Sequence, residues 1–395
     1  MGKPKIRFKG FDDDWEQRKF SELYSKVSEK NDLSFGADKI ISVANMYFKE
    51  EVKESSDEYM RTYNVMRLGD IAFEGNKSKN YSHGRFVENT IGDGIVSHVF
   101  DVFRPTTSYD LLFWKYLINN EGIMGRIMAR CTNASTMMTN LVASDFLKEK
   151  ILVPSLKEQK KIGAYFDSLD HLITLHQRKC DETKKLKNYM LQKMFPQNGQ
   201  TVPEIRFSGF TDVWEQRKLG EIITEYKETV DSNCTLPILT SSKTEGVILQ
   251  EDHFGRKQQH DITGYNILPR NYCTYRNRSD GVDFTFNINK CCDKGIISKF
   301  YPVFSGKNSD VFFLALVLNN SDEVVREIAY TCTGTGQKVL SFLDLQKMNV
   351  KVPSFDEQKE IAAYFDSLDQ LITLHQQKCD ELRNIKKFML QNMFA

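Results

Sequence analysis

Apolar side chains recur with a helical period in two segments, residues 157–195 and 356–394. Along each segment the apolar positions alternate steps of four and three residues, which is the a/d spacing typical of a coiled-coil seam. No proline falls inside either segment, so each is predicted to form one continuous helix of about 58 Å. The positions expected to pair the helices are Ile162, Phe166, Leu169, Ile173 and His176 in the first helix and Ile361, Phe365, Leu368, Ile372 and His375 in the second.

Charge supports pairing between these two helices. The first carries nine Lys/Arg and five Asp/Glu and the second carries five and seven, giving net charges of +4 and −2. Opposite charge favours association of the helices with each other. A parallel and an antiparallel pair both remain open, and an antiparallel pair would place the flanking domains at opposite ends with approximate two-fold symmetry.

Both helices begin with the same four-residue pattern, S-x-x-E. Ser155 with Glu158, and Ser354 with Glu357, predict a capping box in which the serine and the glutamate satisfy each other's backbone N–H groups. Glu158-Gln159-Lys160 also matches the E-x-K half of a nuclease site. The capping interpretation is preferred, because it already explains both glutamates.

The chain is an internal duplication. Pro4-Lys5-Ile6-Arg7-Phe8 recurs as Pro203-Glu204-Ile205-Arg206-Phe207, and 27 of 39 residues of the first helix are identical in the second, always at an offset of 199. Fainter matches at offsets of 200 to 202 connect residues 63–120 with 265–320. Because the matches are mostly apolar and the differences mostly polar, the two halves are predicted to share a core and to differ on their surfaces.

Each half also contains mixed local patterns. Residues 71–73, 99–103, 272–275 and 282–286 are β-branched or aromatic and are predicted strands. Residues 111–119 and 311–319 are predicted short buried helices. The fold class is therefore α+β: two homologous mixed α/β domains joined by the two long helices, with pseudo-two-fold symmetry if these run antiparallel.

Composition narrows the class of protein further. The 395 residues include 54 Lys+Arg and 53 Asp+Glu, a net charge of +1, which excludes a uniformly basic surface but not a local one. Neither a signal peptide nor an apolar run of about 20 residues is present, and the eight cysteines form no C-x-x-C pair, so a cytoplasmic protein without a zinc site is expected. P-loop, G-x-S-x-G, H-E-x-x-H and amino-methyltransferase motifs are missing, which argues against catalysis.

Polar clusters lie where the two halves differ most, and their side chains suit nucleic acid. Arg and Lys match guanine edges and phosphates, Asn and Gln match adenine, and Ser and Thr bind phosphate. A solvated loop is the alternative for any one cluster. The candidate DNA-binding residues are Asn76, Lys77, Lys79, Tyr81, His83, Arg85, Thr132, Asn133 and Ser135 in the first half, and Thr240, Ser242, Lys243, Arg276, Asn277, Arg278, Thr335, Gln337 and Lys338 in the second.

The motif V-P-S-x-x-E-Q-K-x-I-x-x-Y-F-D-S-L-D-x-L-I, at residues 153–173 and 352–372, resembles the specificity subunit of type I restriction-modification systems. The resemblance spans nearly the whole chain. It implies two target-recognition domains, each reading half of a bipartite double-stranded DNA site, with two antiparallel helices as a ruler. It also implies a non-catalytic subunit that binds no cofactor or metal. Two modification subunits would methylate adenine with S-adenosylmethionine, and two restriction subunits would use ATP and Mg²⁺.

This resemblance assigns the segments. Residues 1–150 contain a conserved start and the first recognition domain, residues 151–200 the central helix, residues 201–349 the second start and domain, and residues 350–395 the C-terminal helix. Two alternatives remain: a tandem scaffold presenting two protein- or ligand-binding domains, which should show no salt-dependent DNA binding, and a nuclease or methyltransferase fused in one chain. No membrane partner is expected.

Overall fold

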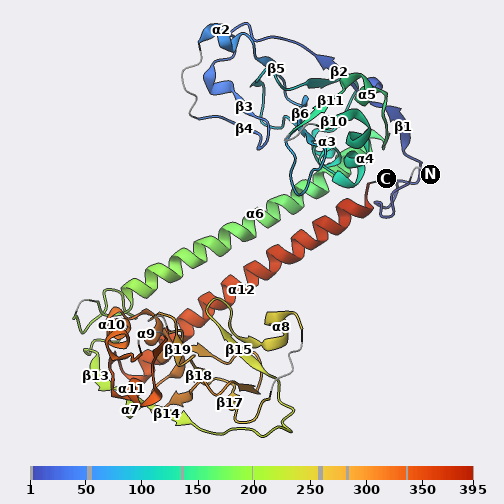
Figure 1. Ribbon diagram of the computed structural model, residues 1–395. Coiled ribbons are helices and arrows are strands. Elements are labelled where there is room, and N and C mark those ends of the chain that lie inside the picture. Colours follow the sequence, from blue (N-terminus) through green and yellow to red (C-terminus); the bar gives the residue numbers. More distant parts are fainter. Residues whose placement is uncertain are drawn as a thin grey trace. The chain divides into compact units, whose positions relative to one another are not determined.

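The computed structural model describes residues 3–50, 56–134, 138–197, 199–256, 261–281, 284–334 and 337–394. The chain forms two compact units (Figure 1). The first unit comprises residues 1–178 and 376–395, and the second comprises residues 179–375. Each unit therefore contains one globular domain together with part of both long helices, α6 (Leu156–Lys193) and α12 (Phe355–Asn392).

The described part of the first unit contains twelve short strands and several short helices in addition to its long-helix segments. The strands are β1 (Glu16–Lys19), β2 (Tyr24–Val27), β3 (Ile41–Ser42), β4 (Tyr47–Phe48), β5 (Asn64–Met66), β6 (Ile71–Glu74), β7 (Arg85–Glu88), β8 (Gly94–Val96), β9 (Val102–Pro105), β10 (Thr132–Ala134), β11 (Thr139–Leu141) and β12 (Lys150–Val153). The helices are α1 (Phe20–Leu23), the 3₁₀ turn η1 (Ala37–Lys39), α2 (Asp57–Met60), α3 (Leu111–Ile118), α4 (Glu121–Cys131) and α5 (Ala143–Lys148).

The second unit repeats this order with small changes. Its strands are β13 (Glu215–Lys218), β14 (Ile223–Tyr226), β15 (Leu239–Ser242), β16 (Gly246–Leu249), β17 (Asn266–Pro269), β18 (Cys273–Thr274), β19 (Arg278–Ser279), β20 (Asn287–Ile288), β21 (Lys294–Ile297), β22 (Val303–Gly306), β23 (Lys338–Val339) and β24 (Asn349–Val352). Its short helices are α7 (Leu219–Ile222), α8 (Gln250–Phe254), α9 (Val311–Asn320), α10 (Asp322–Thr331) and α11 (Phe342–Lys347).

Equivalent antiparallel sheets form in the two units. The strand order β2-β9-β6-β7 in the first matches β14-β22-β18-β20 in the second. Register makes the match residue by residue, because Ile71 pairs with Glu88 and Phe103, whereas Cys273 pairs with Ile288 and Phe304. The predicted α+β fold and the duplicated core are confirmed.

The two long helices pair in antiparallel fashion within each unit. In the first unit, Lys386 of α12 donates to Asp170 of α6 at 2.5 Å, and the Cys379 thiol donates to the Ile173 carbonyl at 3.6 Å. In the second, Lys187 donates to Asp369 at 2.5 Å. Residue numbers rise along α6 while they fall along α12, which answers the question that the sequence left open.

The predicted seam positions divide into two groups. Ile162, Phe166 and Leu169, like their counterparts Ile361, Phe365 and Leu368, are buried in the domain cores, whereas Ile173, His176, Ile372 and His375 are half-buried. The Phe166 ring stacks on Phe394 with centroids 5.7 Å apart, and Phe365 lies 6.0 Å from Phe195. The first turns of each long helix thus anchor a globular domain as well as the partner helix.

The repeated start segment fastens the two long helices to each other in each unit. The Ile6 N–H donates to the Asn392 carbonyl at 2.9 Å, and Ile205 donates in the same way to Lys193. One residue further along, the Arg7 guanidinium donates to both oxygens of the buried Glu158 carboxylate, at 2.7 and 2.8 Å. Arg206 and Glu357 repeat this bidentate contact at 2.7 Å.

This contact corrects the predicted capping box. Ser155 and Ser354 do accept from the N–H of Glu158 and Glu357, at 3.4 Å. The glutamate side chains, however, are taken up by arginine, because two charge-assisted hydrogen bonds stabilise a buried carboxylate better than one backbone N–H. The strand expected at residues 99–103 begins only at Val102, since a turn closes from the Phe100 N–H to the Ser97 carbonyl and leaves Val99 exposed.

Strand boundaries also moved in the second unit. Only Cys273 and Thr274 of the expected strand 272–275 are extended and paired. Of the expected strand 282–286, Val282 and Asp283 lie outside the described residues, and pairing begins at Asn287. The short helices expected at 111–119 and 311–319 are confirmed as α3 and α9. Among the helices described, none has both the length and the apolar character needed to cross a membrane.

Candidate nucleic-acid interface

Two predicted polar segments of the first domain meet beyond the end of β6. Asn76 forms a bridge with Met138, and the Thr139 N–H donates to the Gly75 carbonyl at 2.8 Å. The Thr139 hydroxyl donates to the His83 carbonyl at 3.0 Å. Segments separated by more than fifty residues in the chain thereby lie side by side, one after β6 and the other in the β10–β11 hairpin.

The candidates in this region differ in how freely they could reach a ligand. Glu74 accepts from Asn76 at 3.2 Å and from Arg85 at 3.0 Å, and the Arg85 guanidinium lies over the Tyr81 ring at 5.0 Å. These contacts fix Arg85 within the protein. Lys77, Lys79 and Asn133 are exposed, whereas the Thr132 hydroxyl donates to the Met128 carbonyl. Ser135 lies outside the described residues.

Three predicted segments of the second domain converge in the same way. Strands β19 and β23 pair Arg278 with Val339 and Ser279 with Lys338. The Leu340 N–H donates to the Asn277 carbonyl at 3.0 Å, which extends that contact. The third segment joins through Asn287, whose amide donates to the Ser241 hydroxyl at 2.8 Å. Residues near 240, 278 and 338 are thus brought together by the fold.

A hollow of 440 Å³ opens where these segments meet. Its lining includes Lys243, Arg276, Arg278 and Asp280, so the charged side chains sum to +2. The Arg278 guanidinium lies 4.6 Å from the centre of the Phe300 ring, a cation–π contact that orients it. Burial raises the pKa of the lining residue Tyr301, with nearby Arg276 opposing that shift, so its hydroxyl remains a neutral donor.

The remaining candidates of the second domain shape this hollow rather than point into it. The Ser242 hydroxyl accepts from the N–H groups of Thr244 and Glu245, and the Gln337 amide donates to Asp280 at 3.3 Å. The Asn277 side-chain oxygen is buried, and no partner for it lies within the described residues. Thr240 and Lys338 are half-buried strand residues. Thr335 lies outside the described part of the chain.

Sequence reasoning missed several residues that build this surface. Ser241, Phe284 and Tyr301 line the hollow, and Glu74 organises its counterpart in the first domain. The signal that could have pointed to Ser241 was its place between two chosen neighbours, Thr240 and Ser242. For Tyr301 no local signal existed, because only the folding of residues 276 and 301 against each other makes it a lining residue.

The two surfaces occupy the same place in the duplicated fold. Asn76 follows β6 and Arg276 follows β18, which are equivalent by register. Within the described residues there is no group of three or more His, Cys, Asp or Glu that could hold a metal ion. The fold and the surfaces together define a tandem recognition protein. Two copies of one domain carry different polar surfaces at the same position of the fold.

The chain belongs to the family of the type I restriction modification DNA specificity domain, whose model matches residues 13–185 and again residues 211–384. Each match spans one copy of the duplicated unit as it runs along the chain. Together they cover most of the 395 residues, so both copies share in the assignment.

Individual proteins show the same likeness. The chain is 22% identical over 417 residues to a Methanocaldococcus jannaschii protein provisionally named as the specificity subunit of type I restriction enzyme MjaX, covering 95% of this chain and 91% of that one. It is 22% identical over 259 residues to the MjaVIII specificity subunit of the same organism, covering 60% and 59%. The crystal structure of a type I restriction-modification S subunit from M. genitalium has a TM-score of 0.58 at 13% identity, covering 100% and 99% of the two chains, which shows the shared fold.

Proposed function

We propose that this chain is the non-catalytic, sequence-specific DNA-recognition subunit of a type I restriction-modification complex. Each domain reads one half of a bipartite double-stranded site. One observation carries the proposal: polar segments that differ between the copies, and are scattered along the sequence, converge at the same topological position in both domains. A shared scaffold with divergent surfaces is what reading two different half-sites requires.

The chemistry of the second-domain hollow fits base edges and phosphates. Arg276 and Arg278 can donate in pairs to guanine, while Lys243 supplies a point charge for phosphate. Arg276 and Lys243 are exposed, and Arg278 is oriented by the Phe300 ring. In the first domain the exposed Lys77, Lys79 and Asn133 offer comparable groups of different identity, as a different half-site would need.

The experiment is to replace lining residues of one domain and sequence the methylated motif in cells that also carry the modification subunits. Arg276→Ala combined with Lys243→Ala should relax the half-site read by the second domain and leave the other half intact. The matched variant, Lys79→Ala with Asn133→Ala, should relax only the first half. Each lost base contact costs about 1–3 kcal/mol of discrimination. A motif unchanged in both halves, or altered in both by one pair of substitutions, refutes the assignment.

We further propose that the helix pair sets the spacer between the half-sites. Helix α6 is unbroken over 38 residues, so an added turn would be transmitted along it rather than absorbed by a loop. One helical turn adds about 5.4 Å, equivalent to roughly one to two base pairs at about 3.4 Å per pair. Matched insertions after Arg178 in α6 and Gln377 in α12 should lengthen the spacer in the methylated motif. An unchanged spacer would contradict this role.

Duplicated apolar side chains on the long helices support two equal partner subunits. Leu172 and Tyr189 of α6 are exposed, and so are their counterparts Leu371 and Phe388 of α12. Exposed apolar positions repeated on both helices offer two equivalent docking faces, which suits two modification subunits. In this proposal S-adenosylmethionine is bound by those subunits, ATP and Mg²⁺ are bound by two restriction subunits, and this chain supplies DNA specificity alone.

A further inference from the structure

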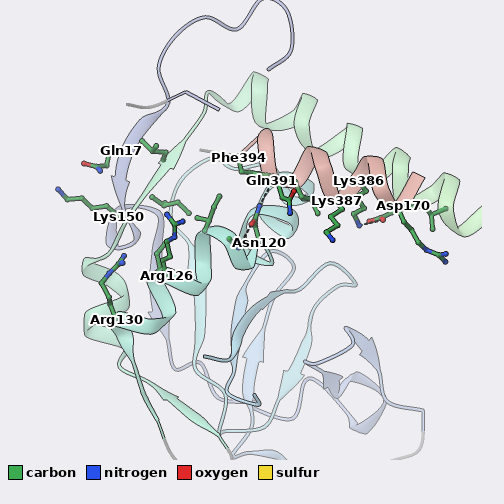
Figure 2. A pocket seen from close by; sticks show the side chains of 18 residues that line it. Gln17, Asn120, Arg126, Arg130, Lys150, Asp170, Lys386, Lys387, Gln391 and Phe394 are labelled. Carbon is green, nitrogen blue, oxygen red and sulfur yellow. Dashed lines mark hydrogen bonds and ion pairs between the residues drawn. The ribbon is translucent and has the colours of Figure 1, made fainter. Parts of the chain in front are cut away.

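The first unit carries a second basic surface, to which none of the candidate DNA-reading residues contributes. It is a groove of 1010 Å³ between α4, β12 and the C-terminal half of α12 (Figure 2). Its floor is apolar and includes Ile127, Ile151, Leu390 and Phe394. Ile151 and Phe394 belong to the buried core of the unit, so the floor is rigid rather than an exposed loop.

Cations surround this floor. Figure 2 shows Arg126, Arg130 and Lys150 contributed by α4 and β12, and Lys386 and Lys387 contributed by α12. With Arg383 the lining holds six cations against one acid, Asp170.

Half of these cations are already paired. Asp170 accepts from Lys386, Glu149 from Arg130, and Asp380 from Arg383. Arg126, Lys150 and Lys387 are exposed and form no ion pair with any described residue. Three unsatisfied positive charges therefore remain around an apolar floor, and they mark the groove as a site for an anionic partner.

The second unit does not repeat this arrangement. Register places Asn349 where the first unit has Lys150, and Lys351 where it has Leu152. Lys351 is neutralised by Glu323 at 2.9 Å, and α10 begins with two acids, Asp322 and Glu323. At the offset of 199 residues, Lys387 is matched by Asn188. Arg126 is matched by Arg326 at an offset of 200, but the described residues of the second unit have no lysine at the positions of Lys150 and Lys387, so two of the three unpaired cations belong to the first unit alone.

We propose that this groove docks an acidic amphipathic helix supplied by another protein, one per chain. Such a helix would cover the apolar floor with its apolar face and place carboxylates against Arg126, Lys150 and Lys387. Duplex DNA could match the cations but has no apolar face with which to cover Ile127 and Leu390. The site goes beyond DNA reading, and because two of its three unpaired cations belong to the first unit alone, the two copies of the duplicated unit should differ in their affinity for this partner.

The test measures fluorescence anisotropy of a labelled synthetic helical peptide bound to the full chain. The peptide carries leucines along one face and glutamates along its flanks, and its twin carries glutamine in place of every glutamate. The Glu peptide should bind at one site per chain and weaken with added salt. The Gln twin should bind at least about tenfold more weakly, since attraction to the rim is lost.

Variants of the chain locate the site. Arg126→Glu with Lys387→Glu should lower the affinity at least about tenfold, and Lys150→Ala alone should lower it by a smaller factor. The matched control, Arg326→Glu with Lys184→Glu, makes the same charge change in the second unit and should leave the affinity unchanged. All four side chains that are reversed lie on helix surfaces, and a thermal melt checks that the variants remain folded.

Three results would overturn the proposal. The first is equal binding of the Glu and Gln peptides. The second is an equal loss of affinity in the second-unit control. The third is displacement of the peptide by a short duplex DNA whose own binding requires Arg126 and Lys387. That result would make the groove a nucleic-acid site instead.

Discussion

Glu88 makes the first domain sensitive to pH in a way that the second domain is not. It lies on β7 opposite Ile71, is 2% exposed, and neither of its carboxylate oxygens has a hydrogen-bond partner among the described residues. Burial, reinforced by Asp110, raises its pKa from 4.5 to about 9. Register places Ile288 at this position in the second domain, which has no titratable group there. The replacement Glu88→Gln therefore removes one titration and preserves the size of the side chain.

The direction of this pH dependence follows from the number of protons that the folded and unfolded chains bind. Between pH 4.5 and about 9 the folded chain keeps a proton on Glu88 that the unfolded chain has lost. The free energy of unfolding of the first domain therefore falls as pH rises, by about 1.4 kcal/mol per pH unit. Between pH 6 and 8 this amounts to about 2.7 kcal/mol. Below pH 4.5 both states are protonated and the loss disappears. In the Glu88→Gln variant this dependence of the free energy of unfolding on pH should be absent. The stability of the variant relative to the wild type should therefore increase as pH rises.

Hydrogen exchange resolved by mass spectrometry is the suitable assay, because it reports opening free energies for each domain separately. Peptides covering β6 and β7 should lose protection between pH 6 and 8, after correction for intrinsic exchange, and peptides covering β18 and β20 should not. Glu16→Gln, at a side chain 77% exposed, serves as a control that should leave the slope unchanged. A first domain whose stability is flat or rises over this range, or a Glu88→Gln variant with the wild-type slope, would refute the reasoning.

Two further predictions concern the contacts that the duplication repeats. Glu158→Gln should destabilise the first unit by about 3 kcal/mol, because it breaks a buried bidentate ion pair, and Glu357→Gln should do the same to the second unit. Chemical denaturation monitored by hydrogen exchange checks both variants. If either substitution destabilised both units equally, the two ion pairs would not act separately. Asp369→Lys should weaken helix pairing in the second unit by about 1 kcal/mol or less, because it breaks the ion pair with Lys187. Adding Lys187→Asp should restore the pairing, and a melting temperature that is not recovered in the double variant would count against a direct pair.

The long helices and the duplication were readable from the sequence because both depend on short-range or repeated patterns. The a/d spacing and the absence of proline dictate an unbroken helix whatever surrounds it. The sequence also showed that Arg7 recurs as Arg206 and that Glu158 recurs as Glu357. The sequence did not predict that the arginine of each unit contacts the glutamate of the same unit, since 151 residues separate the two partners. The glutamate half of the capping-box prediction was wrong for the same reason, because a rule based on neighbouring residues does not include a distant guanidinium, whereas the serine half is present in both helices.

The candidate recognition residues were chosen for their side-chain type and because they lie where the two copies differ. The structure added that segments far apart in the sequence lie close together in the fold. Arg278 lies beside Lys338 because β19 pairs with β23, and Ser241, which accepts a hydrogen bond from Asn287, lines the same hollow as Arg278. The structure also makes some candidates less available to a ligand, because Arg85 is bound by Glu74 and the Asn277 side-chain oxygen is buried. Whether a polar side chain faces solvent or a partner is decided by non-local contacts, which no residue type encodes alone.

Periodicity and repetition were enough to establish the class of fold, the helix pair and the homology of the two halves, because these follow from backbone geometry and from residues a few positions apart. Helix direction, the arginine–glutamate fasteners, the isolated Glu88 carboxyl group and the basic groove of the first unit depended on which distant side chains the fold brings together. Those features arise from packing, where burial and charge are settled jointly by segments that the chain keeps far apart.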